Sequence, residues 1–470
     1  MMLKRLMCVL LSGLLLLGAV SCADMEPSAS TEDTTLSATE EEVTEVKPDL
    51  PEKNYNGAAF RILCENAKTE YFLASETTGS VINDAVLEAN RSVSEEFGVQ
   101  FTQFEGDMET LILSGVDEYD VSYAHDVTTA SLSLQGLFYN VYELPYLDPT
   151  AEWWPSFTVD SLTLNGKMFY FSNYSSYLSM EWTRVCFFNQ RLLNEYKLES
   201  PYDLVRTGKW TIEKINEMSS SIYVDLNGDS KANEGDVFGF ASHYYPFAWL
   251  ESFGIELYEK EAPNSAALSL DLDNDRAYAL IDKLHTWFYS GAEGVAFSLD
   301  DKREIGLRMF ANDQVAFTFA QIGHLAPLSI ENDIQYGIVP FPKIDENEQN
   351  YYGGCTDYLY SVPVTLKDTE RAGIILEAMA YAGYTYIRPA YCDKILETRY
   401  ATDPDCSEML KMILDNQVIS FAFLFATAVP NGMQFRFIAE TVKENNVASF
   451  YKTKQRQEKK MMDKITDFYS

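Results

Sequence analysis

The sequence predicts an α/β protein with more than one hydrophobic core. In its first half, apolar runs of strand length alternate with amphipathic runs of helix length, which is typical of a mostly parallel sheet covered by helices. The length of 470 residues is about three times the roughly 150 residues of an average domain, so two or three cores are expected. The hydrophobic content of 46% excludes a disordered chain. The formal net charge of -35 repels phosphate and makes nucleic acid a poor partner.

The N-terminus has the pattern of an export signal. Lys4 and Arg5 precede an almost wholly apolar run over residues 6–20, with small residues after it. The run is shorter than the ~20 residues that a membrane span needs. We therefore expect residues 1–21 to be a signal peptide.

Residues 19–22 read Ala-Val-Ser-Cys and resemble a bacterial lipobox. In a lipobox the cysteine is acylated, so we expect a lipoprotein signal peptide, with Cys22 as the site of lipidation. The protein would then be extracytoplasmic and anchored to the cell membrane by its acyl chains. Plain secretion without a lipid is the alternative. Residues 22–53 are acidic and nearly free of large apolar side chains, which favours a disordered tether after Cys22.

The first elements are expected in the order strand, helix, strand, helix, strand. Strands are expected over 60–64, 99–104 and 119–124. Apolar residues recur every four positions from Val81 to Phe97, which predicts a helix that ends at Gly98. In parallel sheets, ligands bind outside the carboxyl ends of strands, and His125 and Asp126 follow the third strand directly.

The rest of the chain continues the mixture of strands and helices. Asn165-Gly166 predicts the turn of a hairpin over residues 161–171, and Thr211 predicts the start of a helix that reaches about Ser221. Further strands are expected at 185–189, 315–320 and 336–339, and helices at 190–196, 369–384, 407–416 and 434–470.

The order and spacing of several segments resemble the extracellular solute-binding proteins of ABC importers, in the family 1 group that includes the maltose-binding proteins. The matching segments are 119–121, 164–170, 186–190, 208–211, 310–317 and 336–343, and the resemblance covers nearly all of residues 57–470. It implies an α/β, two-lobed periplasmic-binding-protein-like fold, with hinge strands between the lobes and closure around a ligand.

The resemblance also implies a division of the chain and a set of partners. Lobe 1 would comprise residues 54–160 plus 300–345, and lobe 2 residues 161–299 plus 346–470. The chain would cross between the lobes near 165–171, near 300 and near Pro342. The implied partners are a small-molecule solute and the permease subunits of an ABC transporter, with the binding protein itself a monomer.

Polar and aromatic side chains that follow predicted strands are the candidate ligand contacts. A sugar has an apolar face that stacks on a ring and a rim of hydroxyls that pair with planar polar groups. Trp182 and Trp249 are the expected platforms, and Asp126, Arg184 and Asp357 are expected to make paired hydrogen bonds. The full set is His125, Asp126, Tyr177, Trp182, Arg184, Tyr244, Tyr245, Trp249, Gln321, His324, Tyr352, Asp357 and Tyr358. For each ring taken alone, a place in the hydrophobic core is the alternative.

These residues and the resemblance lead to the expected function. The protein would capture a mono- or oligosaccharide and deliver it to the permease, with a peptide or a polyamine as the alternative ligand. A surface glycan-binding or glycan-hydrolysing lipoprotein that needs no transporter is the alternative function. The sequence holds no GxSxG, HExxH, P-loop, GxGxxG or CxxC pattern, so we expect a binding protein and not an enzyme.

Residues 225–236 predict a calcium loop. Side-chain oxygens stand at positions 1, 3, 5, 9 and 12 of this twelve-residue segment, which is the spacing of an EF-hand loop, and the segment is similar to the shorter dockerin-type loop. Position six holds Ser230 instead of the usual glycine. A solvated turn rich in Asp and Asn is the alternative. The expected Ca²⁺ ligands are Asp225, Asn227, Asp229, Asn233, Asp236 and the backbone carbonyl of Lys231.

Overall fold

The computed structural model describes most of the chain from residue 46, and the end of the predicted tether is packed on the fold, because Leu50 contacts the core and Lys53 pairs with Glu370 at 3.2 Å. The described residues are 46–65, 68–241, 249–262, 265–270, 272–296, 305–324, 334–395 and 404–470. Residues Lys47–Ser470 form one compact unit. The predicted signal peptide and Cys22 lie outside the described residues, as do Tyr244 and Tyr245. None of the described helices is both long and apolar enough to cross a bilayer.

The first of two large sheets contains the strands expected near the N-terminus. Its order is β13-β3-β1-β2, in which β1 runs parallel to β2 and β3, and β13 runs antiparallel to β3. The strands are β1 (Ala58–Cys64), β2 (Val99–Phe104), β3 (Val121–His125) and β13 (Tyr358–Ser361). The sequence placed the first three correctly, whereas β13 comes from the far end of the chain.

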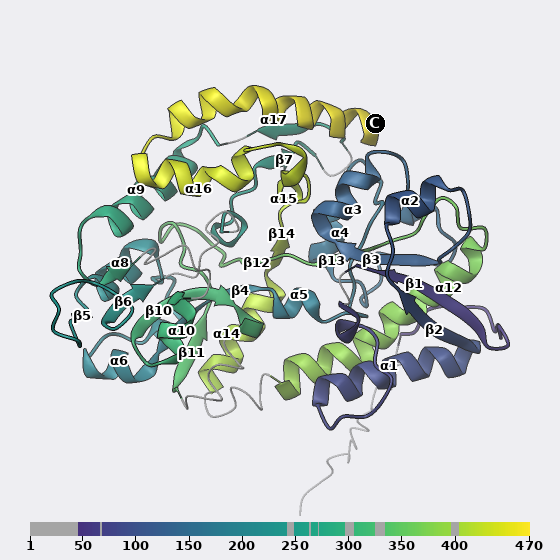
Figure 1. Cartoon of the computed structure of the whole chain (residues 1–470), viewed down its shortest axis with the longest axis horizontal. Coiled ribbons are helices and arrows are strands. Elements are labelled where there is room, and N and C mark those ends of the chain that lie inside the picture. The colour runs from purple at the N-terminus through teal and green to yellow at the C-terminus, as the bar shows by residue number, and fades with distance from the viewer. Residues whose placement is uncertain are drawn as a thin grey trace, which may run out of the picture. The chain divides into compact units, whose positions relative to one another are not determined.

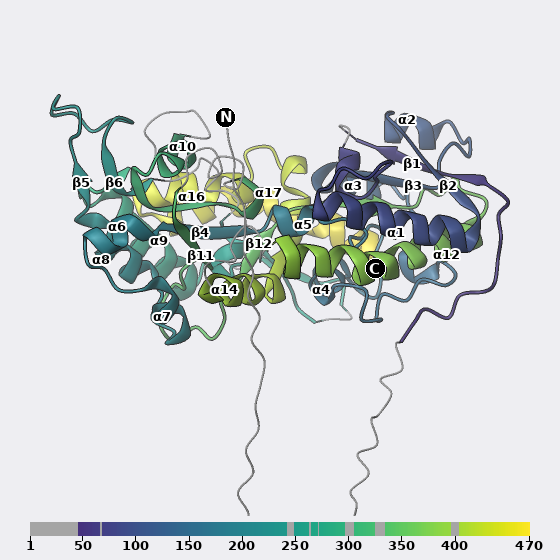
Figure 2. The same cartoon turned by 90° about the horizontal axis from the view of Figure 1, so that it is seen from below.

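Helix α1 (Val81–Phe97) connects β1 to β2, and its bounds confirm the expected helix. One of its faces buries Val86, Val93 and Phe97, and Gly98 ends it in the left-handed conformation at φ 62°. Helix α12 (Thr369–Ala382) packs beside α1 (Figure 2). The first lobe therefore combines the N-terminal strands with a helix that begins more than 300 residues after β1.

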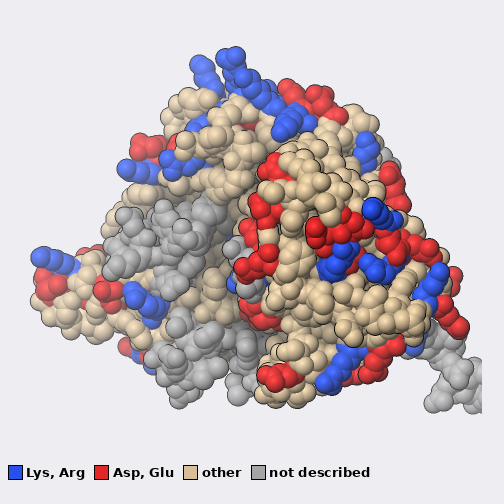
Figure 3. Space-filling model, turned by 45° about the vertical axis from the view of Figure 1, so that its right-hand side comes forward, with Lys and Arg blue, Asp and Glu red and all other residues tan. Residues whose placement is uncertain are grey.

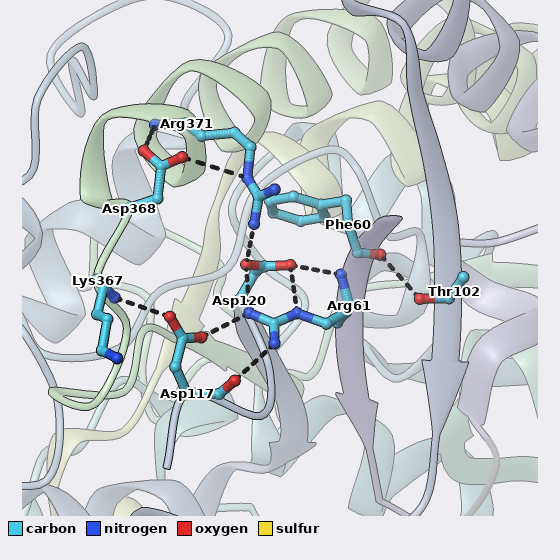
Figure 4. Close-up of polar contacts among 8 residues, drawn as sticks. All are labelled: Phe60, Arg61, Thr102, Asp117, Asp120, Lys367, Asp368 and Arg371. Atoms are coloured by element: carbon cyan, nitrogen blue, oxygen red, sulfur yellow. Dashed lines mark hydrogen bonds and ion pairs between the residues drawn. The ribbon is translucent and has the colours of Figure 1, made fainter. Parts of the chain in front are cut away.

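An ion-pair network joins α12 to the first sheet (Figure 4). Asp120 is fully buried, and its carboxylate accepts hydrogen bonds from the backbone N–H of Arg61 at 2.6 Å and from Arg371 Nη2 at 2.6 Å. Arg61 also contacts Asp117 Oδ1 at 2.6 Å. Because both arginines meet one carboxylate, β1, the turn before β3 and the start of α12 are held together.

The second large sheet has the strand order β11-β4-β10-β6-β5, and β9 also pairs with β6. Its strands are β4 (Arg184–Asn189), β5 (Tyr223–Val224), β6 (Val237–Ala241), β9 (Val295–Ala296), β10 (Val315–Gln321) and β11 (Tyr336–Val339). Its core is aromatic, with the rings of Phe240, Trp287 and Phe319 packed against one another. The helices of this half are α6 (Gln190–Glu195), α7 (Pro201–Arg206), α8 (Ile212–Ser220), α9 (Asp275–Tyr289), α10 (Ile305–Ala311) and α14 (Pro404–Asp415).

The expected division of the chain between the lobes is wrong in two places. Residues 300–345 were expected in lobe 1, but β10 and β11 both pair with β4 in the second sheet. Residues 346–470 were expected in lobe 2, but β13 pairs with β3 and α12 packs on α1. The reason is that apolar periodicity identifies a strand without showing which distant strand it will pair with.

The positions at which the chain crosses between the two sheets also differ from the expected positions. Phe171 bridges to Tyr360 of the first sheet and Arg184 starts β4, so the first crossing lies at 172–183 instead of 165–171. The crossing expected near 300 is wrong, because β9 and α10 on either side of it both contact β6. The chain crosses back between β11 and β13, where Pro342 lies, as expected.

The expected hairpin over 161–171 forms only in part. Asn165 and Gly166 make a tight turn, with positive φ at both, and Leu164 bridges to Lys167. The first arm is not a strand, because residues Ser156–Leu162 form helix α4. A turn motif is thus read correctly from its two residues, whereas the flanking segment is decided by tertiary packing.

A small parallel sheet lies along the return crossing. It pairs β12 (Gly353–Cys355) with β14 (Gln417–Ile419), and β14 follows α14 of the second lobe. Helices α15 (Phe421–Leu424), α16 (Met433–Glu444) and α17 (Val447–Tyr469) complete the chain, with α16 and α17 side by side (Figure 1). The crossing at 172–183, the return between β11 and β13, and this pair of strands therefore connect the lobes, and the chain passes to the second lobe once more between α12 and α14.

Candidate functional site

The carboxyl ends of the parallel strands in the first sheet present several polar and aromatic side chains. Strand β1 ends at Cys64 and is followed by the short helix η1 (Lys68–Tyr71), and β3 ends at His125. Tyr358, the first residue of β13, pairs in register with His125. Because these ends share one edge of the sheet, η1, His125 and Tyr358 lie together there.

The second sheet meets this edge through its own strand ends. Arg184, the first residue of β4, pairs in register with Gln321, the last residue of β10. Trp182 lies two residues before Arg184, just after helix α5 (Leu178–Glu181), and its ring is 5.9 Å from the ring of Tyr358 in an edge-to-face contact. Trp182 and Tyr358 therefore join the two sheet edges.

Four rings form what we call the aromatic wall: Tyr71, Tyr177, Trp182 and Tyr358. Tyr71 and Tyr177 lie 4.9 Å apart, and Tyr358 is also 5.4 Å from the ring of His125. Tyr71, Tyr177, Trp182 and His125 are half-buried, whereas Tyr358 is buried. Half-buried rings that are held by neighbours offer a face to a ligand at a small entropic cost.

The ammonium group of a lysine lies next to the wall. The ammonium group of Lys68 is 5.6 Å from the centre of the Tyr71 ring and 5.9 Å from that of Trp182. This geometry fits a cation–π contact with both rings. It places three hydrogen-bond donors beside an aromatic surface, which is the combination that a polyhydroxylated ligand can use.

His125 is held by the residue that follows it. Its Nδ1 is 2.6 Å from Oδ1 of the fully buried Asp126, and its backbone N–H donates to Glu65 Oε2 at 3.0 Å. Burial lowers the pKa of His125, but the bond to Asp126 outweighs it and raises the pKa above its ordinary value. Asp126 thus orients the imidazole, which lies tilted against the ring of Tyr358.

The three side chains that were expected to make paired hydrogen bonds to a sugar are all buried. Arg184 forms an ion pair with Glu251 at 2.6 Å, and both side chains are less than 10% exposed. Asp357 accepts from the backbone N–H of Tyr358 at 2.7 Å and is fully buried, as is Asp126. Arg184 and Asp357 already have partners inside the protein, whereas Asp126 Oδ2 is buried without one among the described residues, so direct contact of these three side chains with a ligand stays a prediction.

These buried groups form one electrostatic cluster beneath the wall. Burial raises the pKa of Asp357 to about 8 and that of Glu251 to about 7, and the negative charge of Asp126 adds to both effects. Arg184 opposes the rise at Glu251. The ionisation of each of these buried groups between the two sheets thus depends on the charge of the others.

The remaining candidates are distributed more widely. Trp249 is buried in the second core, 5.2 Å from Phe319 and 6.1 Å from Phe341, so its expected role as a platform is wrong and the core alternative holds. Tyr352 lines a separate pocket. Gln321 and His324 are partly exposed at the end of β10.

Lys68, Tyr71 and Glu181 lie at the site but were not among the candidates. Glu181 ends α5, and its carboxylate lies where a side chain at Gly323 would be, just after β10. All three residues stand next to the ends of strands, so the rule that found His125 and Trp182 could have found them. Their segments are short, and no periodic pattern marks them.

The face shown in Figure 3 is hollowed, and Asp and Glu side chains lie along one edge of the hollow. Carboxylates at the rim of a concave surface concentrate negative potential there. They therefore disfavour the entry of an anionic ligand into this hollow.

The segment 225–236 folds as a tight loop of the expected kind. The side chain of Asp225 accepts from the backbone N–H groups of Gly228 at 2.7 Å and Ser230 at 2.9 Å. Ser230 has φ 62°, the left-handed conformation that glycine supplies at this position of an EF-hand loop. The turn therefore forms even though position six holds a serine instead of the usual glycine.

The oxygens at positions five and seven of the loop converge. The amide nitrogen of Asn233 lies 3.2 Å from Asp229 Oδ2 and 2.7 Å from the carbonyl oxygen of Lys231. Over the part of the chain that the structure describes, no group of three or more His, Cys, Asp or Glu side chains is clustered as metal ligands. A cation here would have to bind the mixed set of carboxylate, amide and carbonyl oxygens, after the Asn233 side chain turns.

Comparison with known proteins identifies the fold. No family model and no curated protein sequence matches the chain. Among solved structures, it is similar to an ABC transporter solute-binding protein from Agrobacterium radiobacter K84 in complex with ribitol, with a TM-score of 0.53 and 9% sequence identity over 85% of this chain and 98% of that one. At this identity the likeness speaks for the fold, and the chain has the two-lobed α/β fold of a solute-binding protein.

Proposed function

We propose that the protein is a monomeric, extracytoplasmic solute-binding protein that captures a sugar or a sugar alcohol and delivers it to the permease of an ABC importer. The observation that carries the proposal is the aromatic wall with Lys68 beside it, at the point where the two sheet edges meet. Half-buried rings bind the C–H face of a polyol, and the ammonium and imidazole groups bind its hydroxyls.

The charge of the protein supports an uncharged ligand. The net charge of -35 and the carboxylates along the hollow repel anions. The ammonium group of Lys68 lies at the wall and opposes the binding of a polyamine. The structural neighbour was solved with ribitol, which has the expected chemistry.

The placement of the wall also supports closure on binding. Tyr358 belongs to the first sheet, and Trp182 lies on the crossing that leads to the second. A ligand that contacts both favours the arrangement that brings them together, which is the differential affinity that closure requires. The acyl chain on Cys22 would keep this protein near the permease.

A panel of pentoses, hexoses, oligosaccharides and sugar alcohols tests the proposal, with a melting-temperature shift and quenching of tryptophan fluorescence as readouts. We expect at least one member to bind, and Trp182→Ala to weaken that binding by 10-fold or more, since a stacked ring contributes about 1.5 kcal/mol. Tyr278→Ala, which removes an exposed ring from α9, is the matched control and should leave binding unchanged.

Binding of peptides or polyamines with no response to any carbohydrate would refute the sugar assignment. Incubation with chromogenic glycosides addresses the alternative of a glycan-hydrolysing lipoprotein. Saturable binding without release of product agrees with transport, whereas turnover would overturn it.

The proposal includes a structural Ca²⁺ in the loop 225–236. The convergence of Asp229 and Lys231 oxygens on the Asn233 amide, and the left-handed Ser230, support it. Calorimetric titration of chelator-stripped protein with CaCl₂ should show one site, which Asp229→Ala removes. Absence of heat up to millimolar calcium would exclude the ion.

A further inference from the structure

A pocket of about 400 Å³ lies beside the small sheet that connects the lobes. It is lined by residues of α4, β7 (Tyr258–Lys260), β14 and α15, which lie near one another in Figure 1, and by the segment 254–256. None of the four rings of the aromatic wall lines it. The pocket therefore lies apart from the rings of the proposed solute site, although Glu251 belongs both to its lining and to the charge cluster beneath the wall.

The walls of this pocket are largely apolar. Ile255, Val418, Ile419 and Phe421 contribute aliphatic and aromatic surface, and the ring of Tyr352 lies against Gly254. A cavity of this size with an apolar lining and a few polar groups is typical of a site for a small organic molecule.

One polar group in the lining has unused capacity. Glu251 is 3% exposed, and its Oε1 forms the ion pair with Arg184 at 2.6 Å. Its Oε2 is buried without a hydrogen-bond partner among the residues that the structure describes. A buried carboxylate oxygen without a partner loses free energy that a bound donor would restore.

The other charged groups of the lining that are deeply placed are already satisfied. Lys260 donates to the carbonyl oxygens of Asp160, Ser161 and Thr163 at 2.5, 2.8 and 2.7 Å, so its three protons are used. Glu256 accepts from the backbone N–H groups of Phe421 and Ala422 and from Ser420 Oγ. Neither of these two groups needs a ligand.

The charge of the lining selects the sign of the ligand. Four carboxylates line the pocket, from Asp160, Glu251, Glu256 and Glu259, against the ammonium of Lys260 and the guanidinium of Arg184 that pairs with Glu251. The pocket is thus negative, and a donor that carries positive charge gains the most free energy from the unpaired Glu251 oxygen.

We propose that this pocket binds a small organic cation, namely an amine with an apolar body, whose ammonium group donates to Glu251 Oε2. The alkyl or aryl part fills the space between Val418, Ile255 and Phe421. The site does not depend on the identity of the transported solute.

Isothermal titration of the purified protein with n-hexylamine at pH 8 tests the site, with 1-hexanol and hexanoate as probes of equal chain length. We expect saturable binding of hexylamine, at least 10-fold weaker binding of hexanol and no binding of hexanoate. Glu251→Gln should weaken hexylamine binding 10-fold or more, and Val418→Trp should abolish it by filling the pocket. Glu118→Gln, which neutralises an exposed carboxylate elsewhere, is the control and should change nothing.

Three results would overturn the proposal: no binding of hexylamine, equal binding of hexanol, or unchanged binding by Val418→Trp. The second would show an apolar cavity without selection for charge. The Val418 variant keeps the test decisive if Glu251→Gln does not fold, because it leaves the Arg184–Glu251 ion pair intact. Unchanged sugar binding in the same variant would separate this site from the solute site.

Discussion

Replacement of Asp357 by asparagine tests whether the buried carboxyl group of Asp357, which lies between the lobes, is protonated in the folded protein. Asp357 is fully buried just before β13, and its carboxyl group meets the Ser172 hydroxyl and the backbone N–H of Tyr358. Burial raises its pKa from 3.8 to about 8. Asparagine has nearly the same shape and both hydrogen-bonding functions, but it carries no charge at any pH.

The magnitude follows from the pKa shift. Because the folded protein binds this proton more tightly than the unfolded chain, the stabilisation from Asp357 is full below pH 4 and is lost as the pH rises through 8. Between pH 5 and pH 9 the loss amounts to about three pKa units, or about 4 kcal/mol at 1.36 kcal/mol each. Asp357→Asn lacks this loss, so its stability relative to the wild type should improve by that amount over the same interval.

Urea unfolding at pH 5 and pH 9, followed by tryptophan fluorescence, measures the effect as a difference of differences. Asp463→Asn, which neutralises an exposed aspartate of α17, serves as the control for general changes in net charge. If the free-energy difference between Asp357→Asn and the wild type is the same at both pH values, Asp357 is already ionised in the folded protein at pH 5 and the reasoning is wrong.

Three other substitutions give distinct outcomes in the same urea assay. Asp120→Ala should destabilise the protein by about 3–5 kcal/mol because it strands two arginines around an empty site, and a loss below 1 kcal/mol would contradict this. Gly373→Ala should lower the free energy of unfolding by about 1–3 kcal/mol, since its Cβ would lie 1.8 Å from the carbonyl oxygen of Pro145. If the variant is instead more stable, as alanine usually is relative to glycine within a helix, α12 is free to move away from Pro145. Ser230→Gly should stabilise by up to about 1 kcal/mol because it relieves the left-handed conformation, and a net loss would point to a role for the hydroxyl.

The elements that could be predicted from the sequence are those that local pattern decides. The spacing of apolar residues predicted the helix Val81–Phe97 to the residue, and the apolar run ending at Cys64 predicted β1. The pairing of β10 with β4 and of β13 with β3 could not be predicted, because two strands of similar composition fit either sheet equally well. The error in the lobe boundaries arises from this ambiguity.

For the candidate site too, the sequence predicts which residues lie near strand ends but not which contacts each side chain makes. The rule that ligands bind near strand ends selected His125, Trp182 and Tyr358, whose rings lie in contact, and Tyr177, which lies against Tyr71; whether they bind a ligand stays a prediction. It could not show that Arg184 is occupied by Glu251, because residue type does not show which polar groups already have a partner inside the protein.

The position of β13 at the edge of the first sheet has a consequence for the order in which the protein folds. Ser361 pairs with Ser122, a separation of 239 residues. Closing so large a loop is slow, and the edge of β3 stays open until the chain has emerged past β13. During that interval β3 presents unpaired backbone groups that a strand of another chain can pair with, so this edge is open to aggregation until β13 docks.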